Sequence, residues 1–77
     1  MEKYLNEFNL NEKGKVKKIE AEGQIKRRLF DMGVTPNTEI ILRKYAPLGD
    51  PIEVTIRGYE LTLRKDEANK ILMKVTK

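Results

Sequence analysis

The chain has 77 residues and a formal net charge of +4, from 16 Lys and Arg against 12 Asp and Glu. A chain this short is expected to fold as one domain, residues 1–77, that buries only about 60% of the surface its unfolded form exposes. The sequence contains neither Cys nor His, which excludes disulfides, Cys/His zinc sites and the Cys–His and Ser–His pairs of most hydrolases.

The first predicted element is a short, highly charged strand over residues 15–20, which follows a turn signal at residues 9–14. Its apolar residues, Val16 and Ile19, are three positions apart, so strict alternation would place them on opposite faces of a sheet. We therefore expect a bulge, or an early end of the strand, between them.

A helix is predicted over residues 22–33, "EGQIKRRLFDMG", because Ile25, Leu29 and Met32 recur at helical spacing on one face. Gly33 stands where a helix commonly ends on a left-handed residue. A helix of this length is marginal in water by itself, so its apolar face is expected to pack on a sheet.

From Thr38 onward the hydrophobic period changes to two, which is typical of half-buried strands. This alternation predicts four strands, over residues 38–45, 52–57, 59–65 and 71–76. A single helical turn is predicted at residues 66–70, before the last strand. The pair Arg57-Gly58 predicts a tight hairpin turn with positive φ at Gly58, and Asp66 is placed to cap the helical turn. Five short strands at this spacing favour a small antiparallel barrel, since closure removes exposed sheet edges.

The acidic residues form no recognisable catalytic group, and no phosphate-binding glycine motif is present. Asp50, Glu53 and Glu60 are the carboxylates that a hard-cation site would use, but such a site needs several converging oxygens. Asp50 and Glu53 flank a proline and are expected to point apart, so we interpret all three as solvated. The sequence therefore predicts no enzyme activity, no metal site and no cofactor.

Six basic residues in two segments raise the alternative of nucleic-acid binding. They are Lys15, Lys17 and Lys18 on the first predicted strand and Lys26, Arg27 and Arg28 on the helix. If they converged, they would follow a phosphate backbone, as in small barrels that bind RNA or single-stranded DNA. Glu20, Glu22 and Asp31 interrupt the cations, which favours an ordinary solvated helix face.

Residues 47–51, "PLGDP", read as a loop whose backbone is tightly restricted. Gly49 permits angles that other residues resist, and Asp50 is pushed toward an extended conformation by the proline that follows it. Pro51 has no N–H, so it is suited to begin an edge strand. For Leu48, near the loop tip, the sequence leaves two alternatives. The side chain is either exposed as a docking residue or folded back over the mouth of the barrel.

The motifs together resemble the FeoA family, the small cytoplasmic accessory proteins of bacterial ferrous iron transport. The matching stretches are "RRLFDMGVTPNTEI", "APLGDPIEVTIRGYELTLRKDEANKI" and, more weakly, "LNEF" through "GKVKKI", which together cover nearly the whole chain. The family usually has Gly where this chain has Asn37 and Asn11, and Asn is the next most tolerant residue of positive φ. The resemblance implies an SH3-like fold: mainly β, a five-stranded barrel with one α-helix after the first strand.

The resemblance also implies a partner, the membrane transporter FeoB, which has a cytoplasmic GTPase domain. A protein of this kind would be cytoplasmic, reaching the inner membrane through the transporter without inserting itself, and would bind no nucleic acid. The same domain type occurs fused to iron-dependent repressors, but no winged-helix segment is present here. We expect the binding surface at the "PLGDP" loop, with Leu48 entering an apolar pocket, Arg43 pairing with a partner carboxylate and Tyr45 supplying contact area.

Overall fold

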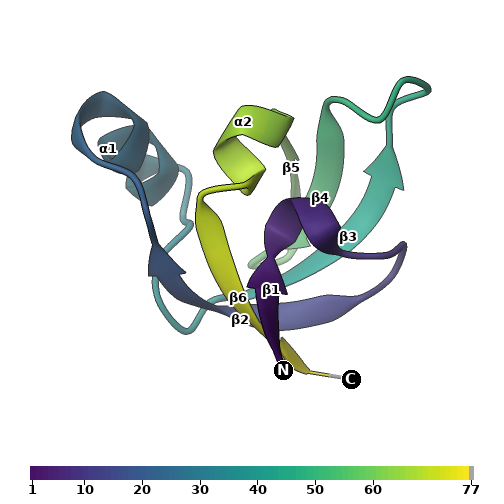
Figure 1. Cartoon of the computed structure of the whole chain (residues 1–77), viewed down its shortest axis with the longest axis horizontal. Helices are drawn as coiled ribbons and strands as arrows, with labels where there is room; N and C mark the ends of the chain where they lie inside the picture. The colour runs from purple at the N-terminus through teal and green to yellow at the C-terminus, as the bar shows by residue number, and fades with distance from the viewer. Residues whose placement is uncertain (77) are drawn as a thin grey trace.

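The computed structural model describes residues 1–76, in which six strands and three short helical segments follow one another along the chain (Figure 1). The elements are β1 (Glu2–Tyr4), the 3-10 helix η1 (Leu5–Glu7), β2 (Lys13–Ile19), α1 (Gly23–Asp31), β3 (Glu39–Tyr45), β4 (Ile52–Ile56), β5 (Tyr59–Leu63), α2 (Lys65–Ala68) and β6 (Ile71–Thr76). The predicted order of helix and strands is confirmed, with β1 and η1 added in front of it.

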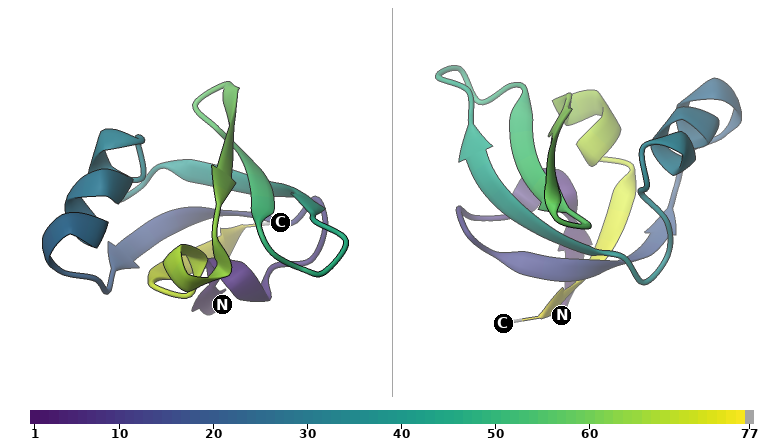
Figure 2. Two further views of the ribbon diagram at one scale, coloured as in Figure 1. Left: turned by 90° about the horizontal axis from the view of Figure 1, so that it is seen from above. Right: turned by 180° about the vertical axis from the view of Figure 1, so that it is seen from behind.

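The strands form one antiparallel sheet in the order β1-β6-β2-β3-β4-β5. The sheet is strongly curved, so that it resembles part of a barrel (Figure 2). The prediction of five strands is wrong by one, because β1 pairs with β6 through three residues, Glu2 to Tyr4. So short a strand carries no alternation that could reveal it. Within residues 1–76, β1 and β5 are the two edges of the ladder, so the expected closure of the barrel is not made by hydrogen bonds all the way round.

The core lies inside this curl and is covered on its open side by η1 and α2. The strands contribute to it every second residue, as in Ile52, Val54 and Ile56, which are all buried. Leu5 from η1 and Ala68 from α2 complete the same cluster. The period-two pattern therefore predicted the inward residues of the sheet, whereas the two helical covers were not predicted as part of the core.

Helix α1 ends at Asp31, and Gly33 follows its Met32 cap as the predicted left-handed residue, with a φ of +93°. The N–H of Val34 donates to the Leu29 carbonyl (2.9 Å) and that of Gly33 to the Phe30 carbonyl (3.0 Å), which is the Schellman arrangement. Leu29 and Val34 are fully buried. The expected packing of the whole apolar face is only partly found, because Ile25 remains 41% exposed where α1 stands out from the sheet (Figure 1).

Local backbone predictions from single residues are mostly confirmed. The register of β2 against β6 shifts between Val16 and Lys18, which is the expected bulge. Arg57 (φ +51°) and Gly58 (φ +85°) both have positive φ, as a tight hairpin turn between β4 and β5 requires. Asn11 and Asn37 share the positive φ that was expected at these positions, with values of +67° and +72°.

The cap of α2 differs from the prediction. Arg64, not Asp66, is the N-cap residue, and Asp66 lies within the first turn. The Glu67 carboxylate accepts a hydrogen bond from the Arg64 backbone N–H at 2.9 Å, so a residue inside the helix satisfies the N–H of the N-cap residue.

Across residues 1–76, none of the helices has the length and apolar content needed to span a bilayer.

Candidate protein-binding surface

The "PLGDP" loop connects β3 to β4 and is ordered by its own backbone hydrogen bonds. The Gly49 N–H donates to the Ala46 carbonyl at 2.7 Å, and the Ala46 N–H donates to the Pro51 carbonyl at 3.0 Å. Gly49 has a φ of +85°, which a residue with a Cβ would adopt only at a cost. The turn therefore depends on glycine at this position.

A side chain of the loop also ties it to the next layer of the fold. Asp50 Oδ1 accepts a hydrogen bond from the Lys65 backbone N–H at 2.9 Å, at the start of α2. This contact satisfies one of the free donors at a helix start. The loop is thus held at its base and against α2, while its tip projects.

Leu48 occupies that tip and is 95% exposed. Of the two alternatives that the sequence left for Leu48, the structure shows the exposed one: the side chain does not fold back over the barrel. An apolar side chain this exposed, on a loop held by hydrogen bonds, has no part in the core and is available for contact with another protein.

Arg43 is exposed on β3 and is held by its neighbours on the sheet surface. Its Nε donates to Thr55 Oγ1 on β4 at 3.0 Å, and a terminal nitrogen lies 3.5 Å from Asn11 Oδ1. The register of β3 against β4 shifts between Leu42 and Lys44, so Arg43 is the bulged residue. No carboxylate lies within 4.0 Å of its guanidinium in the part of the chain that the structure describes.

Tyr45, the last residue of β3, is half-buried against the core. Its hydroxyl donates to the Phe8 carbonyl, 37 residues away in sequence. This bond links the end of β3 to the segment after η1. Tyr45 therefore anchors the strand that leads into the loop, and only the remaining part of its ring is free for contact.

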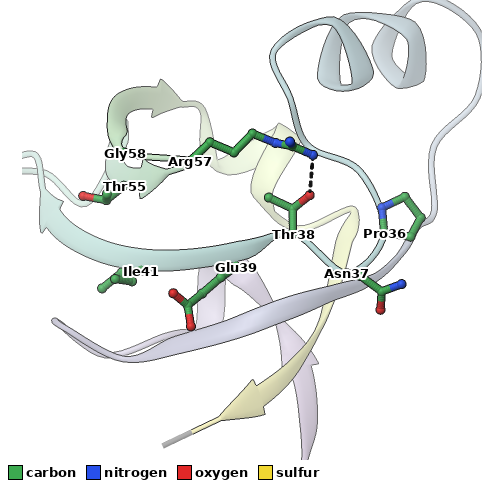
Figure 3. Close-up of a pocket in the computed structure, with 8 residues that line it drawn as sticks. All are labelled: Pro36, Asn37, Thr38, Glu39, Ile41, Thr55, Arg57 and Gly58. Carbon is green, nitrogen blue, oxygen red and sulfur yellow. Dashed lines mark hydrogen bonds between the residues drawn. The ribbon is translucent and has the colours of Figure 1, made fainter.

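An open pocket lies beside the β4–β5 turn, lined by residues 36–39, Ile41, Thr55, Arg57 and Gly58 (Figure 3). The Arg57 guanidinium donates to the hydroxyls of Thr35 (3.0 Å) and Thr38 (3.1 Å). Figure 3 shows Thr38 and Glu39 pointing to opposite sides of the chain, so Arg57 meets a hydroxyl and not the Glu39 carboxylate. Arg57 acts there as a clasp between the β4–β5 turn and the α1–β3 connection.

The clasp has a second member. The Tyr59 hydroxyl donates to the Met32 carbonyl at 2.5 Å, directly above Gly33, where an added Cβ would lie 2.9 Å from that hydroxyl. Gly33 is thus required both for its positive φ and for the space beneath Tyr59. Sequence reasoning recognised the helix end but not this contact, because Tyr59 comes from the distant β4–β5 hairpin.

The acidic residues considered for a cation do not come together: within residues 1–76, no three acidic side chains are grouped so as to hold a metal ion. The Asp50 carboxylate is instead engaged by the Lys65 N–H.

The six basic residues considered for nucleic acid are also divided. Lys17 pairs with Glu2 (2.5 Å), Lys18 with Glu20 (3.7 Å) and Arg28 with Glu67 (2.7 Å). Half of the expected phosphate contacts are thus engaged by carboxylates. The solvated helix face, and with it the absence of nucleic-acid binding, stays a prediction.

Comparison with known proteins places this geometry in a family. The model of the FeoA domain matches residues 3–75. The chain is 30% identical over 67 residues to the Fe(2+) transport protein A/Fe(2+) transporter FeoB fusion protein of Porphyromonas gingivalis. That match covers 87% of this chain but 8% of the fusion protein, so most of the fusion protein has no counterpart here.

Solved structures of similar proteins share the fold. A FeoA-like protein of Clostridium acetobutylicum is 43% identical, with a TM-score of 0.92 over 99% of this chain and 88% of that chain. The FeoA of Stenotrophomonas maltophilia, solved with zinc and described as an SH3 domain protein, is 25% identical, with a TM-score of 0.80 over 92% and 88% of the two chains. The predicted SH3-like fold is confirmed by these similarities.

Proposed function

Since the chain belongs to the FeoA domain family, we propose that it is a non-catalytic accessory protein of ferrous iron transport that binds the cytoplasmic, GTPase-bearing part of a FeoB transporter. The fusion protein of P. gingivalis supports this pairing, because it joins a segment similar to this chain to a transporter in one polypeptide. Joining two domains keeps them at high effective concentration, which suits modules that bind each other. The protein would work in the cytoplasm, next to the inner membrane.

The observation that carries the proposal is the exposed Leu48 on its hydrogen-bonded loop. A preorganised loop loses little conformational entropy on binding, so more of its contact energy appears as affinity. Burying one leucine side chain is worth about 1.5–3 kcal/mol, which corresponds to roughly 10- to 150-fold in the dissociation constant. Removing one residue of this kind is therefore expected to change the affinity by an amount that is easily measured.

Two neighbours on β3 are proposed to complete the surface. Arg43 has its guanidinium oriented by Thr55, and we propose that it pairs with a carboxylate of the transporter. Such a charge pair at the rim of an interface contributes mainly to orientation and association rate. Tyr45 supplies contact area with its free ring edge and holds β3 in place through the Phe8 carbonyl.

The test is the affinity for the purified cytoplasmic part of FeoB from the same organism, measured by isothermal titration calorimetry. We expect Leu48→Asp to abolish measurable binding and leave thermal unfolding unchanged, because Leu48 is 95% exposed. Leu10→Asp is the matched control, since Leu10 is an apolar residue that is 56% exposed outside the loop. Unchanged affinity of Leu48→Asp would remove the loop from the interface, and no binding by the unmodified protein would refute the proposed partner.

A further inference from the structure

Helix α1 has a second apolar position that the fold does not use. Residues of an α-helix advance by about 100° each, so Leu29 and Met32 face the sheet while Phe30 is turned well away from both. Leu29 is fully buried, whereas Phe30 is 40% exposed. An aromatic residue on the outward side of a helix contributes little to the core and is a weaker helix former than Ala or Leu.

Phe30 lies in a shallow depression formed by α1 alone. The lining residues are Gly23, Lys26, Arg27 and Phe30, which we call the α1 outer patch. The Lys26 Nζ lies 5.9 Å from the centre of the Phe30 ring, within reach of a cation–π interaction. The space beside Gly23 is open, since a Cβ added there would find no atom within 4 Å.

The three consecutive cations of α1 are divided by the direction in which they point. Arg28 turns toward α2 and forms an ion pair with Glu67 at 2.7 Å. Lys26 and Arg27 lie on the patch, and among the residues that the structure describes no carboxylate is within 4.0 Å of either. The fold therefore uses one cation of the three and leaves two beside an exposed aromatic ring.

We propose that the α1 outer patch binds an acidic segment of a partner protein, which sets an apolar side chain against Phe30 and carboxylates against Lys26 and Arg27. Aromatic residues and Arg are enriched where interfaces bind tightly, and an Arg guanidinium pairs well with carboxylates in a forked geometry. The depression, built from four residues of one helix, suits a single side chain and not an extended polymer.

A membrane surface and a nucleic acid fit this patch less well. Stable attachment to anionic lipid needs several cations and a broad apolar face, but the patch has two cations and one ring, and Asp31 follows directly on the helix. A single aromatic ring also offers no row on which successive bases could stack. The charge and size of the patch favour a short acidic peptide.

The α1 outer patch is distinct from the Leu48 loop. In Figures 1 and 2, α1 and the β3–β4 loop lie at opposite sides of the molecule, separated by the rest of the fold. The protein would thus present two docking sites, one on each side, and the second does not depend on the proposed transporter partner.

The experiment is an NMR titration of the ¹⁵N-labelled protein with the end-blocked hexapeptide EELFEE and, as a matched control, QQLFQQ. We expect amide shifts confined to residues 23–31, with about tenfold weaker binding of the uncharged peptide because two charge contacts are lost. Arg27→Glu should weaken binding of EELFEE by at least as much, and Phe30→Ala should remove it. Both positions are exposed, so thermal unfolding is expected to be unchanged.

Three outcomes would overturn the proposal. Shifts centred on the Leu48 loop would place the acidic ligand elsewhere, and equal binding of the two peptides would remove the role of Lys26 and Arg27. Binding of α1 to phosphatidylglycerol vesicles, with no response to EELFEE, would identify a lipid surface as the occupant. Because no transporter is used, failure here leaves the proposed function untouched, and failure of the transporter assay leaves this patch untouched.

Discussion

Gly14 in β2 is predicted to be one of the least replaceable residues of the fold. It is buried, and an added Cβ would lie 2.6 Å from the Lys74 carbonyl oxygen, 3.1 Å from Phe8 Cζ and 3.1 Å from Val75 Cα. Gly14 is paired with Val75 on β6 and with Ile40 on β3. The nearest obstacle is thus backbone inside a ladder, which can move only by separating the strands.

The size of the effect follows from two opposing terms. Overpacking a well-packed core costs about 1–3 kcal/mol, and replacing Gly with Ala regains about 0.4–1 kcal/mol by restricting the unfolded chain. Because the nearest obstacle is backbone at 2.6 Å, we take the overpacking term as about 2–2.5 kcal/mol, which leaves a net loss of about 1–2 kcal/mol for Gly14→Ala. At about 4–8 °C per kcal/mol for a domain of this size, the melting temperature should fall by roughly 5–15 °C.

The assay is thermal unfolding followed by circular dichroism, with Lys15→Ala as the control. Lys15 is the next residue of β2 and is exposed, so its truncation should change stability by no more than about 0.5 kcal/mol. A double-mutant cycle separates the two contacts: because the Lys74 oxygen is nearer than the Phe8 ring, Phe8→Leu should not rescue Gly14→Ala. A melting temperature of Gly14→Ala within about 2 °C of the unmodified protein would refute the reasoning.

Three other predictions concern charge and packing. Glu67→Gln should lower the free energy of unfolding by about 1 kcal/mol, and with it the urea midpoint, because it removes the ion pair with the largely exposed Arg28. An unchanged midpoint would count against this link between α1 and α2. The Lys3 ammonium holds the pKa of Glu12 below its ordinary value of 4.5, so Glu12 stabilises the fold above that pH and this contribution is lost as the pH falls through the folded pKa. Glu12→Gln should therefore lose less stability than the unmodified protein when urea unfolding is compared at pH 5 and pH 3, and equal losses would contradict the assignment. Leu42→Ala truncates a fully buried side chain and should lower the free energy of unfolding by about 2–5 kcal/mol. So large a loss should leave much of this small domain unfolded, which one-dimensional NMR would detect.

The sequence by itself determined the features that depend on neighbouring residues. Gly33 ends α1 and Arg57-Gly58 turns the hairpin because the allowed backbone angles are a property of those residues. The alternation in β4 identified its inward side chains because successive strand residues point to opposite faces. The family resemblance rested on the same local motifs and correctly implied the SH3-like fold.

Only the tertiary structure decided which surfaces are free. β1 forms because β6 is there to pair with it. Tyr45 is only partly available for a partner because its hydroxyl already donates to the Phe8 carbonyl. Leu48 and Phe30 are both apolar, and their exposure depends on how the loop and the helix leave the sheet. Burial is set by contacts between residues far apart in the chain, and no local pattern contains that information.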